Sequence, residues 1–435
     1  MINGRLTTAE TAERLGVKAQ TVYAYVSRGL LHPERSPKGS TFDRRQVALL
    51  ARSARQPGGP GRPEGPSRAR PVPPGERAAD AGAGRLPGGG DPVFVTELTL
   101  IDGGRLYYRG RDAVELSRSW SFERTAEWLW TGRDPGPQVT WPDRPAGPAG
   151  PSPAGGPAGA ADGVAPIERF MVATVAASLQ DELRHDLDPL RLPATGRVLL
   201  QVLADSLPLG GDAAVGSSMA ERVWRGLNRH PADASALAAV DAALVLSADH
   251  ELAPSTLAAR VAASFRADPY AVVLTGLGPS GGTWPAGSTG APGEVEAMLA
   301  RAAVVGAERA LGEQLRRSGE TPHGFGMPLY PHGDPRGREL LARVSRAGSP
   351  ERWDVVERVL EVARQRGFPP PNFDLGLGAL SFCADMVSGA GQAVFTLGKA
   401  AGWLAHAMEE YADPTRFRSR ADYVGARPEA TSGSS

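Results

Sequence analysis

The sequence of 435 residues has a single cysteine, Cys383, and no net formal charge. One cysteine cannot form an intramolecular disulfide or supply a cysteine-rich zinc site. Lysine plus arginine equals aspartate plus glutamate, at 48 each, so there is no general attraction to nucleic acids or anionic membranes. A nucleic-acid contact would therefore need a local basic patch. Cys383 lies in an apolar stretch and is interpreted as a small buried residue.

The sequence also lacks a long apolar segment. Residues 1–15 carry charged side chains throughout, which argues against a secretory signal peptide. The most apolar later run, residues 237–246, is too short to cross a membrane and is interrupted by Asp241. We therefore expect a soluble, cytoplasmic protein with no membrane partner.

Two segments have almost no large apolar residues and are rich in proline, glycine and alanine. Residues 56–92 are predicted to be a disordered linker, and residues 135–163 a disordered insertion in a surface loop. Neither can bury enough apolar surface to offset the loss of chain entropy on folding. The linker separates an N-terminal module, residues 1–55, from a body at residues 93–427, and residues 428–435 form a short tail.

The body is predicted to be mostly α-helical. Residues 101–110 are typical of a strand, a turn and a second strand, and a helix containing Phe122 and Leu129 follows. Over residues 164–425, Ala, Leu, Val and Arg recur at helical spacing, with breaks at glycine or proline. Strand patterns are scarce beyond residue 110.

The N-terminal module begins with a helix signal. Thr7 and Glu10 fit a capping box in which Thr7 is the N-cap, and Gly16 ends the helix. A second helix is predicted over residues 18–28, and a small wing over residues 38–42. The second helix leaves these side chains available for contacts: Lys18, Gln20, Thr21, Tyr23 and Arg28.

This pattern resembles the helix-turn-helix of MerR-like and excisionase-like proteins, whose second helix enters the major groove of DNA. The resemblance implies that residues 1–55 contact DNA. A docking or dimerisation device that never touches DNA is an equal alternative, because one such module binds weakly and its basic face is modest.

Motifs along residues 93–425 resemble those of bacterial citrate synthases and occur in the family's order. They are IDGGRLYYRGRDAVEL with SFERTAEWLWTG, then SADHELAPSTLAARVAASFRADPYAVVLTGLG, GFGMPLYPHGDPR, PNFDLGLGAL, and finally FTLGKAAGWLAHAMEE with RFRSRADYVG. The resemblance implies an all-helical, two-lobed body with a small N-terminal β-hairpin, preceded by the helix-turn-helix module. It also implies a dimer.

Citrate synthases condense acetyl-CoA with oxaloacetate, which requires a base, an electrophile for the enolate oxygen and cations for a dianion. The resemblance implies that Asp374 is the catalytic base and that His250 binds oxaloacetate. Arg336 and Arg418 match carboxylate-binding arginines. In the family the tail arginine, here Arg418, reaches the partner subunit's site.

The turn formed by Gly324, Phe325 and Gly326 matches the family's loop that faces CoA. CoA would act as a cosubstrate, and we expect no permanently bound cofactor and no metal. Three other histidines have no motif support and are interpreted as structural: His185, His230 and His406.

At three positions the chain departs from the family pattern. Pro285 and Met327 replace two active-site histidines, and neither side chain can donate a hydrogen bond or move a proton. Lys399 replaces an arginine, which keeps a substrate-binding charge but loses the bidentate fork. His323 and His332 are candidates to substitute for the lost imidazoles, although surface histidines are the simpler interpretation.

The resemblance therefore implies a citrate synthase-like acyltransferase that forms citrate from oxaloacetate and acetyl-CoA, or a related acyl-CoA, with turnover weakened by the two replaced histidines. One alternative is an inactive paralogue that binds oxaloacetate, citrate or CoA and acts as a regulator or heterodimer partner. Another is a DNA-binding regulator that uses the body as a dimerisation scaffold. We expect Pro285 and Met327 to line one cleft with His250, Arg336 and Asp374.

Overall fold

The structure is a computed structural model that describes these residues: 5–27, 31–36, 39–44, 46–47, 94–142, 164–210, 216–280, 291–318 and 321–414. The chain divides into two compact units, with the boundary between Val95 and Thr96. The predicted linker, most of the predicted insertion and the tail lie outside the described residues. So do three candidate site residues: Arg28, Pro285 and Arg418.

The N-terminal unit combines two helices with a three-stranded antiparallel sheet. Its elements are β1 (Arg5–Thr7), α1 (Thr8–Leu15), α2 (Ala19–Ser27), β2 (Pro33–Ser36) and β3 (Gly39–Asp43), and the strand order is β1-β3-β2. The predicted capping box is confirmed, since Thr7 Oγ1 accepts from the Glu10 amide and the Glu10 carboxylate accepts from the Thr7 amide. Gly16 ends α1 with a φ of 65°, as predicted.

The second unit begins with a small antiparallel sheet. Strands β4 (Thr99–Asp102), β5 (Arg105–Tyr108) and β6 (Arg111–Asp112) pair in that order, and α4 (Ala113–Ser119) and α5 (Phe122–Thr131) follow. The predicted strand–turn–strand is therefore confirmed. Gly103 and Gly104 form the turn, with φ values of 56° and 74° that favour glycine.

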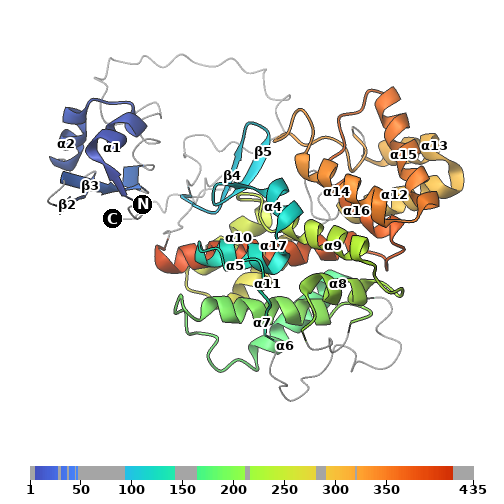
Figure 1. Cartoon of the computed structure of the whole chain (residues 1–435), viewed down its shortest axis with the longest axis horizontal. Coiled ribbons are helices and arrows are strands. Elements are labelled where there is room, and N and C mark those ends of the chain that lie inside the picture. The colour runs from blue at the N-terminus through green and yellow to red at the C-terminus, as the bar shows by residue number, and fades with distance from the viewer. Residues whose placement is uncertain are drawn as a thin grey trace, which may run out of the picture. The chain divides into compact units, whose positions relative to one another are not determined.

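The rest of this unit is helical, as predicted. One group comprises α6 (Pro166–Ser178), α7 (Leu192–Asp205), α8 (Met219–Leu227), α9 (Ala234–Ser247), α10 (Pro254–Ser264), α11 (Pro269–Ser280) and α17 (Ala390–Ala412). The other comprises α12 (Ala291–Val305), α13 (Ala307–Ser318), α14 (Pro335–Ala347), α15 (Pro350–Gln365) and α16 (Phe373–Cys383). Figure 1 shows the second group gathered on one side of the unit, with α14 and α16 nearest to the first. None of the helices in the described ranges combines the length and apolarity that crossing a membrane requires.

Helix α17 lies unusually close to its neighbours α9 and α11. A Cβ added at Gly276 would lie 2.6 Å from Trp403 Cδ2, and one at Gly398 would lie 2.5 Å from Ser247 Cβ. A Cβ at Gly402 would overlap the carbonyl oxygen of Ala248. These glycines let the backbones approach and fix the depth at which α17 presents its side chains. The predicted burial of Cys383 is also confirmed.

Candidate active site

Asp249 is a fully buried carboxylate in the turn between α9 and α10. Its Oδ2 accepts a 2.5 Å hydrogen bond from Thr99 Oγ1 and lies 3.1 Å from His406 Nε2. Its Oδ1 lies 3.5 Å from Lys399 Nζ. Burial alone would raise the pKa of Asp249, but His406, Lys399 and the hydrogen bonds outweigh it and hold that pKa well below its usual range. Asp249 therefore stays ionised, and its hydrogen bonds fix the chain directly before His250.

His406 and Arg260 extend this polar network between α17 and α10. Arg260 Nη1 lies 2.8 Å from His406 Nδ1 and 3.1 Å from Glu409 Oε2, and its Nε donates to Glu410 Oε1 at 2.6 Å. Because a guanidinium can only donate, His406 Nδ1 must accept. The ring proton therefore sits on Nε2 and points at Asp249. This arrangement agrees with the structural role expected for His406.

His250 is largely buried, and its side chain meets Tyr330. The His250 Nε2 atom lies 2.9 Å from the Tyr330 hydroxyl oxygen, and the two ring centroids are 5.7 Å apart. Burial, together with the positive charges of Arg336 and Lys399, lowers the pKa of His250 well below its usual range. The imidazole is therefore neutral at neutral pH and can both donate and accept a hydrogen bond.

Arg336 is buried at the start of α14. Its guanidinium makes a two-point ion pair with Asp334, with Nε–Oδ1 at 3.1 Å and Nη2–Oδ2 at 2.8 Å. It lies over the rings of Tyr330 and Phe373, at 5.6 Å and 4.8 Å from their centroids. No described residue accepts a hydrogen bond from Nη1. Nη1 is therefore the nitrogen of Arg336 whose donor capacity the described residues leave unused.

Asp374 lies in the first turn of α16, whose N-cap is Asn372. Asn372 Oδ1 accepts from the amides of Asp374 and Leu375, at 3.0 Å and 3.3 Å. No described residue hydrogen-bonds to the Asp374 carboxylate. Burial raises the pKa of Asp374 to about 7, with Arg336 opposing and Asp334 adding to that effect. A carboxylate with a pKa near neutrality and no fixed partner is suited to take a proton.

The loop that contains Met327 is tied to the segment before Asp374. The amide of Asn372 donates to the carbonyl of Gly324 at 2.9 Å, and its Nδ2 donates to the carbonyl of Gly326 at 2.9 Å. Both glycines have left-handed φ values, 91° and 75°. Met327 is half-buried and its carbonyl accepts from the Tyr330 amide at 2.8 Å. The candidate CoA loop and the candidate base are thus parts of one local assembly.

Lys399 is a buried ammonium on α17. Its Nζ donates to Thr256 Oγ1 at 3.0 Å and pairs with Asp249 Oδ1 at 3.5 Å. Burial lowers the pKa of Lys399, although Asp249 opposes that effect. The charge of Lys399 is therefore already balanced inside the fold, and only one of its three protons is left for another acceptor.

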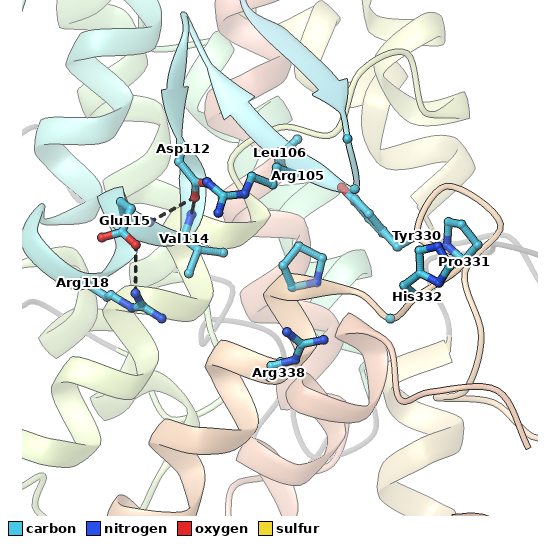
Figure 2. Close-up of a pocket in the computed structure, with 14 residues that line it drawn as sticks. Arg105, Leu106, Asp112, Val114, Glu115, Arg118, Tyr330, Pro331, His332 and Arg338 are labelled. Carbon is cyan, nitrogen blue, oxygen red and sulfur yellow. Dashed lines mark hydrogen bonds and ion pairs between the residues drawn. The ribbon is translucent and has the colours of Figure 1, made fainter.

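A cleft of about 430 Å³ lies next to this cluster, between the β4–β5 turn, α4 and the loop that leads into α14. Figure 2 shows Arg105 and Asp112 on one side of it and Tyr330, Pro331 and His332 on the other. Tyr330 lines the cleft and also contacts His250. His250, Arg336, Asp374 and Met327 do not line it, so the cleft found is adjacent to the candidate cluster. His332 is exposed in the cleft wall, whereas His323 is half-buried elsewhere on the loop.

The structure thus brings His250, Arg336 and Asp374 into one electrostatic cluster, although they are far apart in sequence. It says nothing of Pro285 or Arg418, which lie outside the described residues. Sequence reasoning overlooked two residues of the cluster, Tyr330 and Asp334. Both stand in the quoted GFGMPLYPHGDPR motif with Arg336, but nearness in sequence does not tell which side chains they contact.

In the N-terminal unit, the candidate DNA contacts on or just before α2 differ in exposure. Lys18, Gln20 and Tyr23 are exposed, and Thr21 is half-buried. Val22 is fully buried in the unit's core. The exposed side chains are consistent with a contact face, and Tyr23 is 55% exposed.

Two protein-family models match the chain. The model described as citrate synthase, C-terminal domain, matches residues 171–420, and that described as MerR HTH family regulatory protein matches residues 6–55. Citrate synthase 2 of Bacillus subtilis (strain 168) is 29% identical over 191 residues, which is 43% of this chain and 50% of that relative. Putative citrate synthase 2 of Mycobacterium tuberculosis (strain ATCC 25618 / H37Rv) is 32% identical over 197 residues, 44% of this chain and 52% of the relative. The chain therefore spans about half the length of these curated relatives.

Solved structures share the fold. Citrate synthase from Thermotoga maritima has a TM-score of 0.60 and 22% identity, over 78% of this chain and 95% of that one. Citrate synthase from Thermoplasma acidophilum, solved as a ternary complex with carboxymethyl coenzyme A and oxaloacetate, has a TM-score of 0.61 and 20% identity, over 78% and 95%.

Proposed function

Because this chain belongs to the citrate synthase family, we propose that its helical body condenses oxaloacetate with acetyl-CoA, or a related acyl-CoA, to give citrate. The observation that supports this most directly is the carboxylate of Asp374. No described residue hydrogen-bonds to it, its pKa is raised to about 7, and it belongs to the same cluster as His250 and Arg336. A base, a neutral imidazole and a guanidinium are the groups that the reaction requires.

Each group has a proposed task. Asp374 removes a proton from the methyl carbon of the acyl thioester, and the resulting enolate attacks the ketone carbon of oxaloacetate. His250 donates a hydrogen bond to oxaloacetate, and Arg336 Nη1 holds one of its carboxylates. Lys399 and Arg418 add positive charge for the second carboxylate. Water then hydrolyses the thioester and releases CoA as a free thiol.

CoA takes part as a cosubstrate, and we propose no permanently bound cofactor. The backbone of Gly324, Phe325 and Gly326 is the proposed CoA contact. Its support is the position of this turn in a motif that resembles the loop facing CoA in citrate synthases. A coenzyme A thioester and a keto acid are metabolites of the cell interior, so we also propose a cytoplasmic location.

Turnover is expected to be slow. Pro285 and Met327 occupy positions where the family resemblance places histidines, and a positioned acid or base contributes about 10²- to 10⁴-fold to a rate. Removing two such groups is not additive when they act as one unit. We therefore propose an enzyme that is weaker than its intact relatives.

A second candidate function is supported by the ion pairs and hydrogen bonds that the site residues already make with other residues of the chain. Arg336 is paired with Asp334, Lys399 with Asp249, and His250 meets Tyr330. Ligand-binding groups that already have partners suit a paralogue that binds oxaloacetate, citrate or CoA without turnover. Such a chain could act as a regulator or as the heterodimer partner of an active citrate synthase.

Dimerisation has its own support on α6. Val172 and Val175 on α6 and Leu179, its C-cap, are exposed and are spaced three and four residues apart, so they form an apolar stripe on one face at the end of that helix. We propose that a second subunit, identical or paralogous, covers this stripe. Arg418 would then complete the partner's site.

For residues 1–55 we propose DNA binding through α2. The support is the match to MerR regulatory proteins and the exposed Lys18, Gln20 and Tyr23, with Thr21 and Arg28 completing the proposed face. Retardation of duplex DNA by the full chain, lost in a Lys18→Ala, Tyr23→Ala variant, would support it. Equal retardation by both would remove this part of the proposal.

The condensation is tested by following thiol release from acetyl-CoA in the presence and absence of oxaloacetate. We expect slow, oxaloacetate-dependent release that disappears in Asp374→Ala, with Asp385→Ala, an exposed carboxylate elsewhere, unchanged. If oxaloacetate or CoA raises the unfolding temperature but no thiol appears at high protein concentration, the inactive paralogue is the better description.

A further inference from the structure

Tyr330 is the only described residue that hydrogen-bonds to His250. Its hydroxyl oxygen lies 2.9 Å from His250 Nε2, and its side chain is 2% exposed. Among the described residues the hydroxyl has no other partner, and none binds His250 Nδ1. Each group therefore has hydrogen-bonding capacity that the described residues leave unused.

The ring of Tyr330 is held in place without its hydroxyl. Its amide donates to the carbonyl of Met327 at 2.8 Å, and its carbonyl accepts from the amide of Gly333 at 2.9 Å. The guanidinium of Arg336 covers one face at 5.6 Å from the centroid. Removing the hydroxyl alone should leave the loop intact, so the hydroxyl is available for a role that is not structural.

Both groups remain uncharged near neutral pH. Burial raises the pKa of Tyr330 above its ordinary value, with Arg336 partly opposing, and lowers that of His250. When the imidazole proton sits on Nε2, the N–H and the phenol O–H are two neutral donors that converge on one small region. Two such donors stabilise negative charge on an oxygen, because their dipoles are fixed before the charge develops.

We propose that His250 Nε2–H and the Tyr330 hydroxyl together bind the ketone oxygen of a 2-oxo acid, which makes Tyr330 a catalytic residue. In the resting chain one of the two groups donates to the other, and the ketone oxygen enters between them and accepts from both. During condensation the ketone π electrons move to that oxygen as the carbon–carbon bond forms, and the pair stabilises the alkoxide. The inference rests on the proposed condensation and supplies a donor that Met327 cannot.

The test uses the full chain, the isosteric variant Tyr330→Phe and a matched control, Tyr411→Phe. Tyr411 is also buried and its hydroxyl donates to the carbonyl of Ala267 at 2.5 Å. We expect kcat for thiol release to fall about 10²-fold in Tyr330→Phe, with KM for oxaloacetate changed less than about threefold. The control should keep its kcat, and all three proteins should unfold at similar temperatures.

A second measurement does not need turnover. Oxaloacetate labelled with ¹³C at the ketone carbon should show a downfield shift when it binds, because hydrogen bonds to the oxygen draw electron density from the carbon. The shift should shrink in Tyr330→Phe and persist in Tyr411→Phe. Absence of thiol release with this pattern intact would remove the condensation but keep the binding role of the pair. An unchanged carbonyl shift in Tyr330→Phe, or no binding of oxaloacetate to the wild type, would overturn the inference.

Discussion

Two carboxyl groups, Asp374 and Asp241, have pKa values near neutrality for the same reason: burial disfavours their charged forms. They differ in their surroundings. Asp374 has no described hydrogen-bond donor, whereas Asp241 Oδ1 accepts from the Phe122 amide at 3.0 Å. Under the proposed function the first exchanges protons with a ligand, whereas the second holds the start of α5.

The pH dependence of thiol release follows from Asp374. A base acts in its deprotonated form, so the rate should rise with pH and level off above its pKa of about 7. Stopped thiol assays from pH 5.5 to 9 would measure the midpoint. A rate that is flat across this range, with Asp374→Ala still inactive, would show that proton removal by Asp374 does not limit turnover.

The contribution of Asp241 to the free energy of unfolding should fall as pH rises. Burial, with a contribution from Glu123, raises the pKa of Asp241 in the folded chain from 3.8 to about 7. The folded state therefore binds a proton that the unfolded state releases, and this stabilisation is complete below about pH 4 and lost by about pH 7. Relative to the wild type, Asp241→Asn should raise the free energy of unfolding little at pH 4 and by on the order of 2 kcal/mol at pH 8. Thermal unfolding at both values would check it, and an equal gain at both would contradict the cause given.

At the scale of elements, the position of Lys399 and His406 depends on how closely α17 packs. A Cβ at Gly402 would overlap the Ala248 carbonyl and lie 2.9 Å from Asp249 Oδ1. Gly402→Ala should therefore destabilise the chain by about 1–3 kcal/mol despite the better helix propensity of alanine. Gly312→Ala in α13 is the control, because its nearest neighbour would be Arg316 Nη1 at 3.6 Å. That change should stabilise slightly, and equal effects in the two variants would contradict this explanation.

Local signals in the sequence predicted helices, strands and turns better than they predicted side-chain contacts. The capping box at Thr7, the turn at Gly103 and the helical body could be anticipated because each depends on residues close in sequence. The grouping of His250, Arg336 and Asp374 was implied only by family resemblance. The Arg336–Asp334 pair and the Tyr330 contact could not be inferred from spacing, because they depend on side-chain directions at the N-terminus of α14 and in the loop before it. No periodicity encodes such a loop.

At the scale of the whole molecule, each unit has its own hydrophobic core. Leu6, Val22 and Phe42 belong to the core of the first, and the larger core of the second includes Trp403. A chain that lacks residues 1–55 should therefore unfold within about 1 °C of the full chain and keep its thiol release, while losing any DNA binding. Calorimetry and retardation of DNA would measure both. A clear fall in unfolding temperature would show that the N-terminal unit stabilises the body.

Tyr330 lines the cleft of Figure 2, and its hydroxyl contacts His250, which lies outside the cleft. A molecule packed against the ring from the cleft would hold the hydroxyl on His250. A keto acid that enters between the two donors needs the ring to retreat toward the cleft. The two occupants would therefore exclude each other. A compound bound in the cleft against Tyr330 would compete with the keto acid without contacting Asp374. Inhibitors of such a site should therefore be designed to pack against the Tyr330 ring.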